Sequence, residues 1–288
     1  MKHRIILLPI IALALVTMAC GVTINLPEFA DVKTGPTVAE AIRVPLNGEE
    51  TYDLTLEFGA GELNVSPGAS EYLVEGIATY NVEDLRPEIK IDDEAVRITT
   101  GNLEVGGIPV FSDNLKNEWD LELAPVAMRL RITAGAYAGN YDLGGLALEG
   151  LYISDGAADV DLTFSEPNTV VMDTFRYDTG ASNVNLYNLL NANFEEMIFN
   201  AGAGDYNLEF IGQMSHDVNV RIETGLSDLS VTVPEDANVI LQVDTALADF
   251  SVPGSFHRDG GDYVQEGTGP TLTIRINVGV GDLTIRTD

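Results

Sequence analysis

A row of acidic residues recurs along the chain and could bind a hard cation. Each member stands three positions after a recurring glycine or alanine. The carboxylates of the repeats are Asp159, Asp205, Asp228, Asp249 and Asp282, with Glu62 and Asn183 at equivalent positions. Carboxylate and amide oxygens are the ligands that Ca²⁺ prefers in proteins. The alternative is a turn role, in which these short side chains accept hydrogen bonds from nearby backbone N–H groups.

The N-terminus holds a second candidate site, Cys20, which is the single cysteine of the chain. Basic residues at 2–4 precede an apolar stretch at 5–16 that is too short to span a bilayer comfortably. The segment ends in Thr17-Met18-Ala19 and resembles a bacterial lipoprotein signal peptide. The resemblance implies cleavage after Ala19 and lipidation of Cys20, which would attach the protein to a membrane. A plain secretory signal cleaved at the same place is the alternative.

Composition argues against several classes of function. The chain has 288 residues, 45 acidic and 15 basic, for a formal net charge of −30. Nucleic-acid binding requires clustered Lys and Arg, so we expect no nucleic-acid partner. Outside the signal, His216 and His257 have no metal-ligand spacing, and no nucleophile elbow or phosphate-binding loop is present. We therefore expect no catalytic residues and no cofactor other than Ca²⁺.

The acidic row implies a repeating backbone, because its members stand about 22 residues apart. Apolar and polar residues alternate on both sides of each corner, as at 218–224 and 227–233, which is typical of half-buried strands. The corner residues are Gly135, Gly156, Gly180, Gly202, Gly225, Ala246 and Gly279. Glycine there serves either a positive φ or close approach of the next coil. Since a two-strand unit cannot bury its apolar face alone, we expect an all-β fold of stacked coils, a β-solenoid.

The longest spacing, between Ala246 and Gly279, indicates an inserted loop that leaves the order of the coils unchanged. Before the repeats, we expect a signal peptide at 1–19, a tether at 20–45 and β-hairpins within an N-terminal β region at 46–127. Residues 39–44 are also compatible with an edge strand. The repeats then occupy 128–288, and 186–197 is expected to form a turn or one short helix.

Several short motifs carry a family resemblance. Phe58-Gly59-Ala60-Gly61-Glu62-Leu63, Tyr80-Asn81, Trp119-Asp120-Leu121 and the repeats at 153–160, 177–184, 199–208 and 222–231 resemble the toast-rack family of bacterial envelope proteins. That family is similar to adhesin-type β-helix domains and to the extracytoplasmic part of LiaF-like stress regulators. The resemblance covers most of residues 51–288 and implies a β-solenoid. The membrane helices of LiaF-like regulators have no counterpart in this sequence.

These features predict a lipid-anchored, extracytoplasmic protein of the cell envelope that acts by surface recognition as an adhesin-like or structural module. One alternative is an accessory envelope-stress sensor that binds a cationic ligand or a membrane partner. A further alternative is a glycan-active β-helix enzyme. An envelope protein or a glycan is the expected partner, and Tyr187 and Phe111, which fall outside the apolar phase, are candidate contacts.

Overall fold

The computed structural model describes residues 29–101, 108–110 and 114–288. The chain divides into a larger unit, residues 33–103 and 114–288, and a smaller one, residues 1–32 and 104–113. In the smaller unit, β1 (Phe29–Asp31) pairs in parallel with β7 (Ile108–Val110). Residues 1–19, where a signal peptide is expected, lie outside the described residues, as do Cys20 and Phe111. In the described part of the chain, no helix has both the length and the apolar character needed to cross a bilayer.

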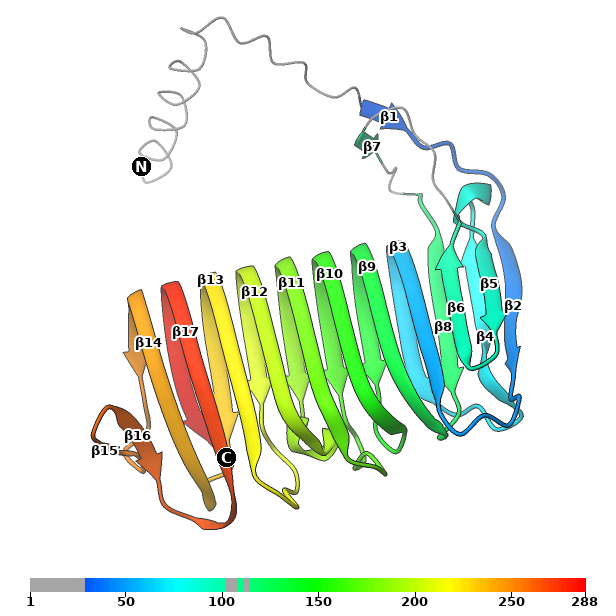
Figure 1. The fold of residues 1–288 in the computed structure, drawn as a ribbon. Coiled ribbons are helices and arrows are strands. Elements are labelled where there is room, and N and C mark those ends of the chain that lie inside the picture. Colours follow the sequence, from blue (N-terminus) through cyan, green and yellow to red (C-terminus); the bar gives the residue numbers. More distant parts are fainter. Residues whose placement is uncertain (1–28, 102–107, 111–113) are drawn as a thin grey trace, which may run out of the picture. The chain divides into compact units, whose positions relative to one another are not determined.

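Eight long parallel strands form the body of the larger unit, and each one bends sharply near its middle (Figure 1). They are β3 (Tyr52–Pro67), β9 (Ala127–Asp142), β10 (Ala147–Thr163), β11 (Met172–Tyr187), β12 (Phe194–Glu209), β13 (Val218–Val233), β14 (Ala237–Ser251) and β17 (Thr268–Thr287). The bend returns each strand toward its start, so that short connections join the successive strands from β9 to β14. Longer segments separate β3 from β9 and β14 from β17. The expected all-β solenoid is therefore confirmed.

Shorter elements extend the stack at both ends. β8 (Asn117–Leu123) pairs with β3, and β4 (Tyr72–Tyr80) and β2 (Val38–Pro45) continue the sheet in antiparallel fashion. The hairpin of β5 (Pro87–Asp92) and β6 (Ala95–Thr100) joins β3, and β15 (His257–Asp259) and β16 (Asp262–Gln265) border β14. Two 3₁₀ helices, η1 (Glu83–Leu85) and η2 (Leu189–Ala192), complete the elements, and η2 confirms the short helix expected at 186–197. Residues 38–45, at the end of the expected tether, form the edge strand β2.

The bend divides each long strand into a first leg and a second leg, whose apolar sides face each other. In β13 the first leg, residues 218–224, buries Val220 and Ile222, and the second leg, residues 227–233, buries Leu229 and Val231. The legs meet in β12, where the rings of Phe199 and Tyr206 lie 5.3 Å apart. Full burial of such side chains contributes roughly 1.5–3 kcal/mol each, so this inter-leg layer is the main source of stability.

Close approach, and not backbone conformation, requires the corner glycines. A Cβ added to Gly202 would lie 2.4 Å from the carbonyl oxygen of Gly180, and a Cβ on Gly180 would lie equally close to that of Gly156. Contacts of that length do not occur, and none of these three glycines has a positive φ. The positive φ falls two positions later, as at Gly204, where φ is 151°. Both expected reasons for glycine therefore apply: close approach at the corner position, and a positive φ two residues later.

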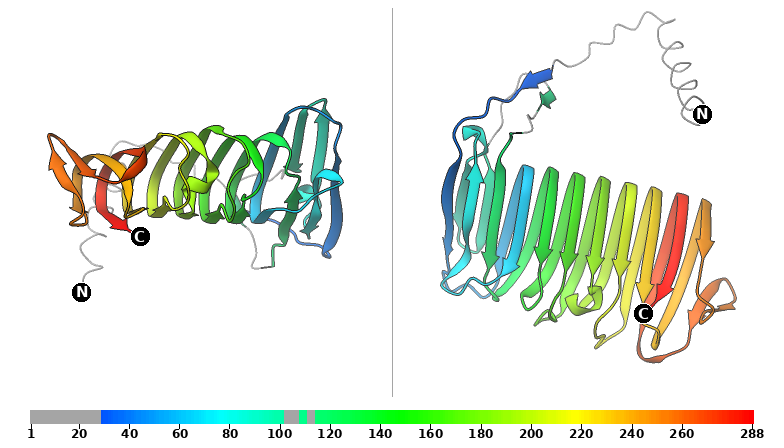
Figure 2. Two further views of the ribbon diagram at one scale, coloured as in Figure 1. Left: turned by 90° about the horizontal axis from the view of Figure 1, so that it is seen from below. Right: turned by 180° about the vertical axis from the view of Figure 1, so that it is seen from behind.

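The order of the final coils differs from the order of the sequence. β17 pairs in parallel with both β13 and β14, so the last strand lies between its two predecessors (Figure 2). The expectation that the inserted loop leaves the coil order unchanged was wrong. The segment from 252 to 267 includes β15 and β16, and β16 pairs with the outer edge of β14 before the chain returns to the inner edge.

A carboxylate that the sequence analysis did not single out lies inside the corner. Asp155 is 8% exposed and accepts hydrogen bonds from the hydroxyls of Tyr177 (2.7 Å), Tyr137 (3.3 Å) and Thr179. Burial, followed by the charge of Asp155, holds the pKa of the Tyr177 hydroxyl well above its usual value, so this group remains a donor. The cluster ties β10 to β9 and β11 through side chains in addition to the backbone ladder.

Substitution of a corner glycine should destabilise the fold because the neighbouring backbone cannot move aside. We expect Gly202→Ala to lower the unfolding free energy by about 1–3 kcal/mol, the usual cost of overpacking. Gly254→Ala is the matched control, because a Cβ there meets no atom within 4 Å. Urea denaturation measures both, and an equal loss in the two variants would contradict the close-approach explanation.

Removal of the buried carboxylate should leave hydroxyl donors without an acceptor. We expect Asp155→Ala to cost about 2–4 kcal/mol of unfolding free energy, because the buried hydroxyls of Tyr177 and Tyr137 lose their acceptor. Thr179 can still donate to Ser182. Asp173→Ala, which changes an exposed carboxylate on β11, should change stability by less than about 0.5 kcal/mol. Thermal denaturation at neutral pH compares the two, and a neutral effect of Asp155→Ala would show that the cluster is dispensable.

Candidate recognition surface

The predicted acidic row exists as a line of residues across neighbouring coils. Backbone pairing places its members in one register, in the order Asp159, Asn183, Asp205, Asp228, Asp282 and Asp249. Ala138 separates Glu62 from Asp159 in the same register. The row stands on the exposed side of the second legs, and its members are about 4.8 Å apart, one strand spacing.

A straight row of carboxylates cannot surround a single Ca²⁺ ion. Ca²⁺ takes six to eight oxygen ligands, whereas a straight row gives each carboxylate neighbours on two sides only. Across residues 29–101, 108–110 and 114–288, no group of three or more His, Cys, Asp or Glu is placed to hold a metal ion. In the same ranges no turn N–H donates to the five aspartates, so the turn role is not supported either. The calcium hypothesis for these aspartates stays a prediction.

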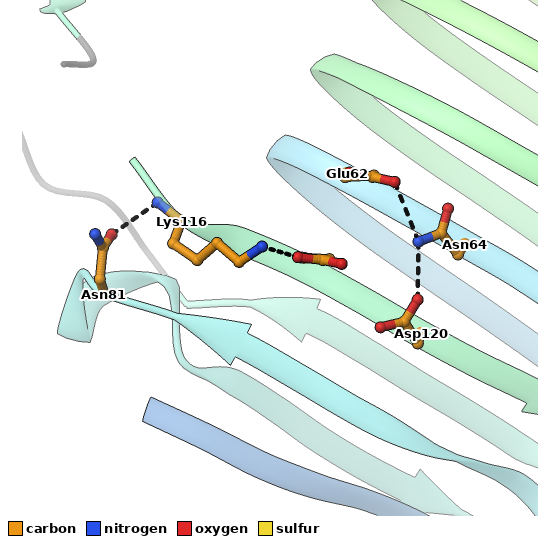
Figure 3. Close-up of polar contacts among 6 residues, drawn as sticks. Glu62, Asn64, Asn81, Lys116 and Asp120 are labelled. Carbon is orange, nitrogen blue, oxygen red and sulfur yellow. Dashed lines mark hydrogen bonds and ion pairs between the residues drawn. The ribbon is translucent and has the colours of Figure 1, made fainter. Parts of the chain in front are cut away.

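A second polar row, two residues further along each second leg, is connected by hydrogen bonds. Asn64 donates to Asp120 at 2.8 Å, and Asn140 donates to Asn64 at 2.9 Å. Asn185 donates to Asp161 at 2.8 Å on the next pair of strands. We call Asp120, Asn64, Asn140, Asp161 and Asn185 the amide ladder. Figure 3 shows Asn64 between Asp120 and Glu62, whose carboxylate also accepts from it at 3.4 Å.

The amide ladder lies along a groove of about 820 Å³ on the exterior of the second legs. The groove runs from β2 and β4 across β8, β3, β9 and β10 to β11. Ile77, on β4, contributes an apolar side chain that is 51% exposed, and Tyr187 contributes an aromatic ring from β11. The outward position predicted for Tyr187 therefore places it in this groove.

The chemistry of the groove suits a ligand with many hydroxyl groups. The ladder amides donate to neighbouring side chains, while the carboxylates of Asp120 and Asp161 keep further lone pairs for a ligand. Burial, followed by the charges of Asp161 and Glu209, raises the pKa of Tyr187, so its hydroxyl stays a donor. Arg43, the single base among the lining residues, is paired with Glu75 at 3.3 Å. The groove therefore favours neutral or cationic ligands over anionic ones.

Side-chain hydrogen bonds connect β4 and β8, two strands that line the groove. The backbone N–H of Lys116 donates to the Asn81 side-chain oxygen at 2.8 Å, and the Asn81 amide donates to the carbonyl of Asn114 at 2.6 Å. The Lys116 ammonium in turn pairs with Glu118 (Figure 3). These contacts join the end of β4 to the start of β8, and both strands contribute residues to the groove.

Sequence reasoning found one residue of the groove and missed the ladder. The alternation of apolar and polar residues predicted an outward position for Tyr187, whereas it assigned no role to the ladder residues. The available signal was the position two residues after the acidic row, which is Asn or Asp in several consecutive coils. Ile77 had no comparable signal, because it lies in an antiparallel strand outside the repeats.

Comparison with known proteins gives a family for the first part of the chain. Residues 33–174 match the family described as the N-terminal domain of toast_rack, DUF2154. No curated protein matches the chain.

Several solved structures resemble the chain at low sequence identity. A "putative cell adhesion protein" from Clostridium sporogenes is 21% identical, with a TM-score of 0.47, over 88% of this chain and 100% of its own. A "putative adhesin" from Bacteroides fragilis is 10% identical, with a TM-score of 0.44, over 89% and 99%. A "putative lipid binding protein" from Parabacteroides distasonis is 9% identical, with a TM-score of 0.38, over 90% and 99%. The toast-rack resemblance is confirmed by the family match over residues 33–174.

Proposed function

We propose that this protein is a non-catalytic, adhesin-like component of the bacterial cell envelope that recognises its partner through the second-leg groove. The observation that carries the proposal is the amide ladder on the groove surface. Its polar groups are held in place by one another, so a ligand meets a preformed surface and little side-chain entropy is lost on binding.

The residues along the groove favour a glycan as the partner. Carbohydrate ligands present hydroxyl donors and apolar ring faces, which the ladder carboxylates and the Tyr187 ring complement. The acidic surroundings disfavour a negatively charged sugar and favour a neutral or amino sugar. An envelope protein that presents a basic segment is the second candidate partner, as the sensor hypothesis requires.

The proposed location rests on the N-terminal sequence. Residues 1–19 have the charge and apolar pattern of an export signal, and Cys20 follows at the position that a lipoprotein signal requires. A diacyl anchor would hold the protein stably on the membrane, because two acyl chains provide the affinity that one lacks. The recognition surface would then be displayed outside the cytoplasm.

The groove proposal predicts a selective loss of glycan binding. We expect Tyr187→Ala combined with Asp161→Ala to weaken binding to immobilised neutral and amino-sugar oligosaccharides by about tenfold or more, because a stacking surface and an acceptor are removed. Asp228→Ala, an exposed carboxylate of the acidic row outside the groove, should leave binding within about twofold.

Two results would contradict the groove proposal. The first is equal binding by the groove variant and the wild type. The second is release of new reducing ends from the oligosaccharides, which would favour the glycan-active enzyme. Cross-linking on intact cells separates the remaining alternatives, since capture of a membrane-embedded signalling protein would support the sensor.

The anchor proposal predicts that fatty-acid labelling depends on one residue. When cells that express the protein grow with radioactive palmitate, we expect label on the wild type and none on Cys20→Ala, because the thiol is the acylation site. The wild type should also fractionate with membranes. Unchanged labelling of the variant would refute lipidation at Cys20, and release of unlabelled wild type into the medium would support the plain secretory signal.

A further inference from the structure

From β6 to β13, arginines occupy every second strand of one register on the outer side of the first legs, and β17 adds one more directly beside β13. Backbone pairing places Arg97, Thr55, Arg131, Tyr152, Arg176, Ile198, Arg221, Arg275 and Gln242 side by side in that order. We call this line the arginine track. It crosses β6, β3, β9 to β13, β17 and β14, which lie side by side in Figure 1. None of its nine residues is acidic.

We propose that the arginine track binds a linear acidic polysaccharide laid along the stacking axis, with its anionic groups on alternate strands. From Arg97 to Arg221 the guanidinium groups recur at two strand spacings, about 10 Å. That repeat suits a polymer with one anionic group per disaccharide. The track lies on the face opposite the groove, so the inference does not depend on the groove as a recognition site.

Two arginines of the track lie on adjacent strands at the end nearest β14. Arg221 and Arg275 stand directly beside each other on β13 and β17 and line a pocket of about 370 Å³. Three carboxylates share this lining, those of Glu223, Asp244 and Asp262, so an anion must bind close to the two guanidinium groups. Among the track arginines in the described residues, Arg131, Arg221 and Arg275 form no ion pair, whereas Arg97 and Arg176 do. Like charges at neighbouring positions of a sheet destabilise it, so an oxyanion between them would relieve a repulsion that the fold otherwise tolerates.

Arg275 is also oriented by other side chains. Its Nε donates to the Gln242 oxygen at 2.7 Å, and the Gln242 amide donates to Asp262 at 3.1 Å. This chain of contacts engages one edge of the guanidinium and leaves the terminal nitrogens available. Two such nitrogens form the fork that binds carboxylate and sulfate oxygens in a bidentate manner.

The other arginines of the track are held by neighbouring side chains. Arg176 uses Nε and Nη2 to bind Asp178, at 2.6 and 2.9 Å, which leaves Nη1. The guanidinium of Arg131 lies 4.7 Å from the ring centre of Tyr152, which keeps it extended along the surface. Because four carboxylates flank the track on the corner side, a ligand must follow the line of arginines closely. They are Glu57, Asp178, Glu223 and Asp244. Binding should therefore be selective for charge spacing and sensitive to salt.

The test compares defined oligosaccharides by calorimetry at low ionic strength. We expect a hyaluronan oligosaccharide, with a carboxylate on every second sugar, to bind more tightly than an oligogalacturonate, which carries one on every sugar. A neutral chitin oligosaccharide should not compete for the track. Arg275→Gln should weaken hyaluronan binding by about tenfold through loss of a charge-assisted contact.

The matched control is Arg286→Gln. This residue is exposed on the second leg of the same strand, so the variant has the same change in net charge on the opposite face. It should retain wild-type affinity, and so should Tyr187→Ala in the groove. Absence of hyaluronan binding, or equal losses in the two arginine variants, would overturn the proposal. Equally tight binding of poly-glutamate would overturn the assignment to a polysaccharide.

Discussion

The close approach of backbones at the corner is the constraint on which the rest of the structure depends. Gly225 and Leu226 are both exposed, although residues alternate everywhere else in β13. Two successive outward residues reverse the phase, so the inward side of the first leg and that of the second leg face each other. Within the stack this bend leaves no space for a side chain, because a Cβ on Gly225 would lie 2.6 Å from the carbonyl oxygen of Gly202. An alanine, Ala246, takes the position only in β14, the last of the long strands in the sheet. The glycine column thus makes the two-layer core possible.

The same bend gives the protein two outer faces with different chemistry. The first-leg face carries Arg131, Arg176, Arg221 and Arg275 among its acids, whereas the acidic row and the amide ladder occupy the second-leg face. A net charge of −30 conceals this division, because composition sums both faces. Only the register of the coils shows that most of the arginines of the long strands share one side.

The sequence was sufficient to predict the coil but not the neighbours of every coil. Period, alternation and corner glycines are local signals, so the solenoid, the acidic register and the outward position of Tyr187 could be predicted. The position of β17 could not, since either edge of β14 accepts a parallel strand with the same alternation. Composition does not reveal the order either. At matching inward positions β17 has Ile274, Ile276 and Val278, and β14 has Leu241, Val243 and Thr245. The interior strand β13 also has a threonine, Thr224, opposite Val278. The groove also escaped prediction, because Ile77 and Tyr187 come together only through the stacking of β4, β8, β3, β9, β10 and β11.

The acidic row costs stability, yet it is compatible with a stack that ends in an exposed strand. Unit charges about 5 Å apart repel by roughly 1 kcal/mol in water, and salt reduces this further. Each coil recovers more than that, because several of its buried apolar side chains contribute about 1.5–3 kcal/mol each. β14 pairs with β16 only over Val239 to Leu241, so its second leg is an open edge that could template pairing with another chain. Asp249 is exposed on that leg, and an isologous pairing would bring the acidic rows of two highly charged molecules together. The repulsion between carboxylates, which is small against the apolar burial of one solenoid, therefore opposes the pairing of two solenoids through this edge.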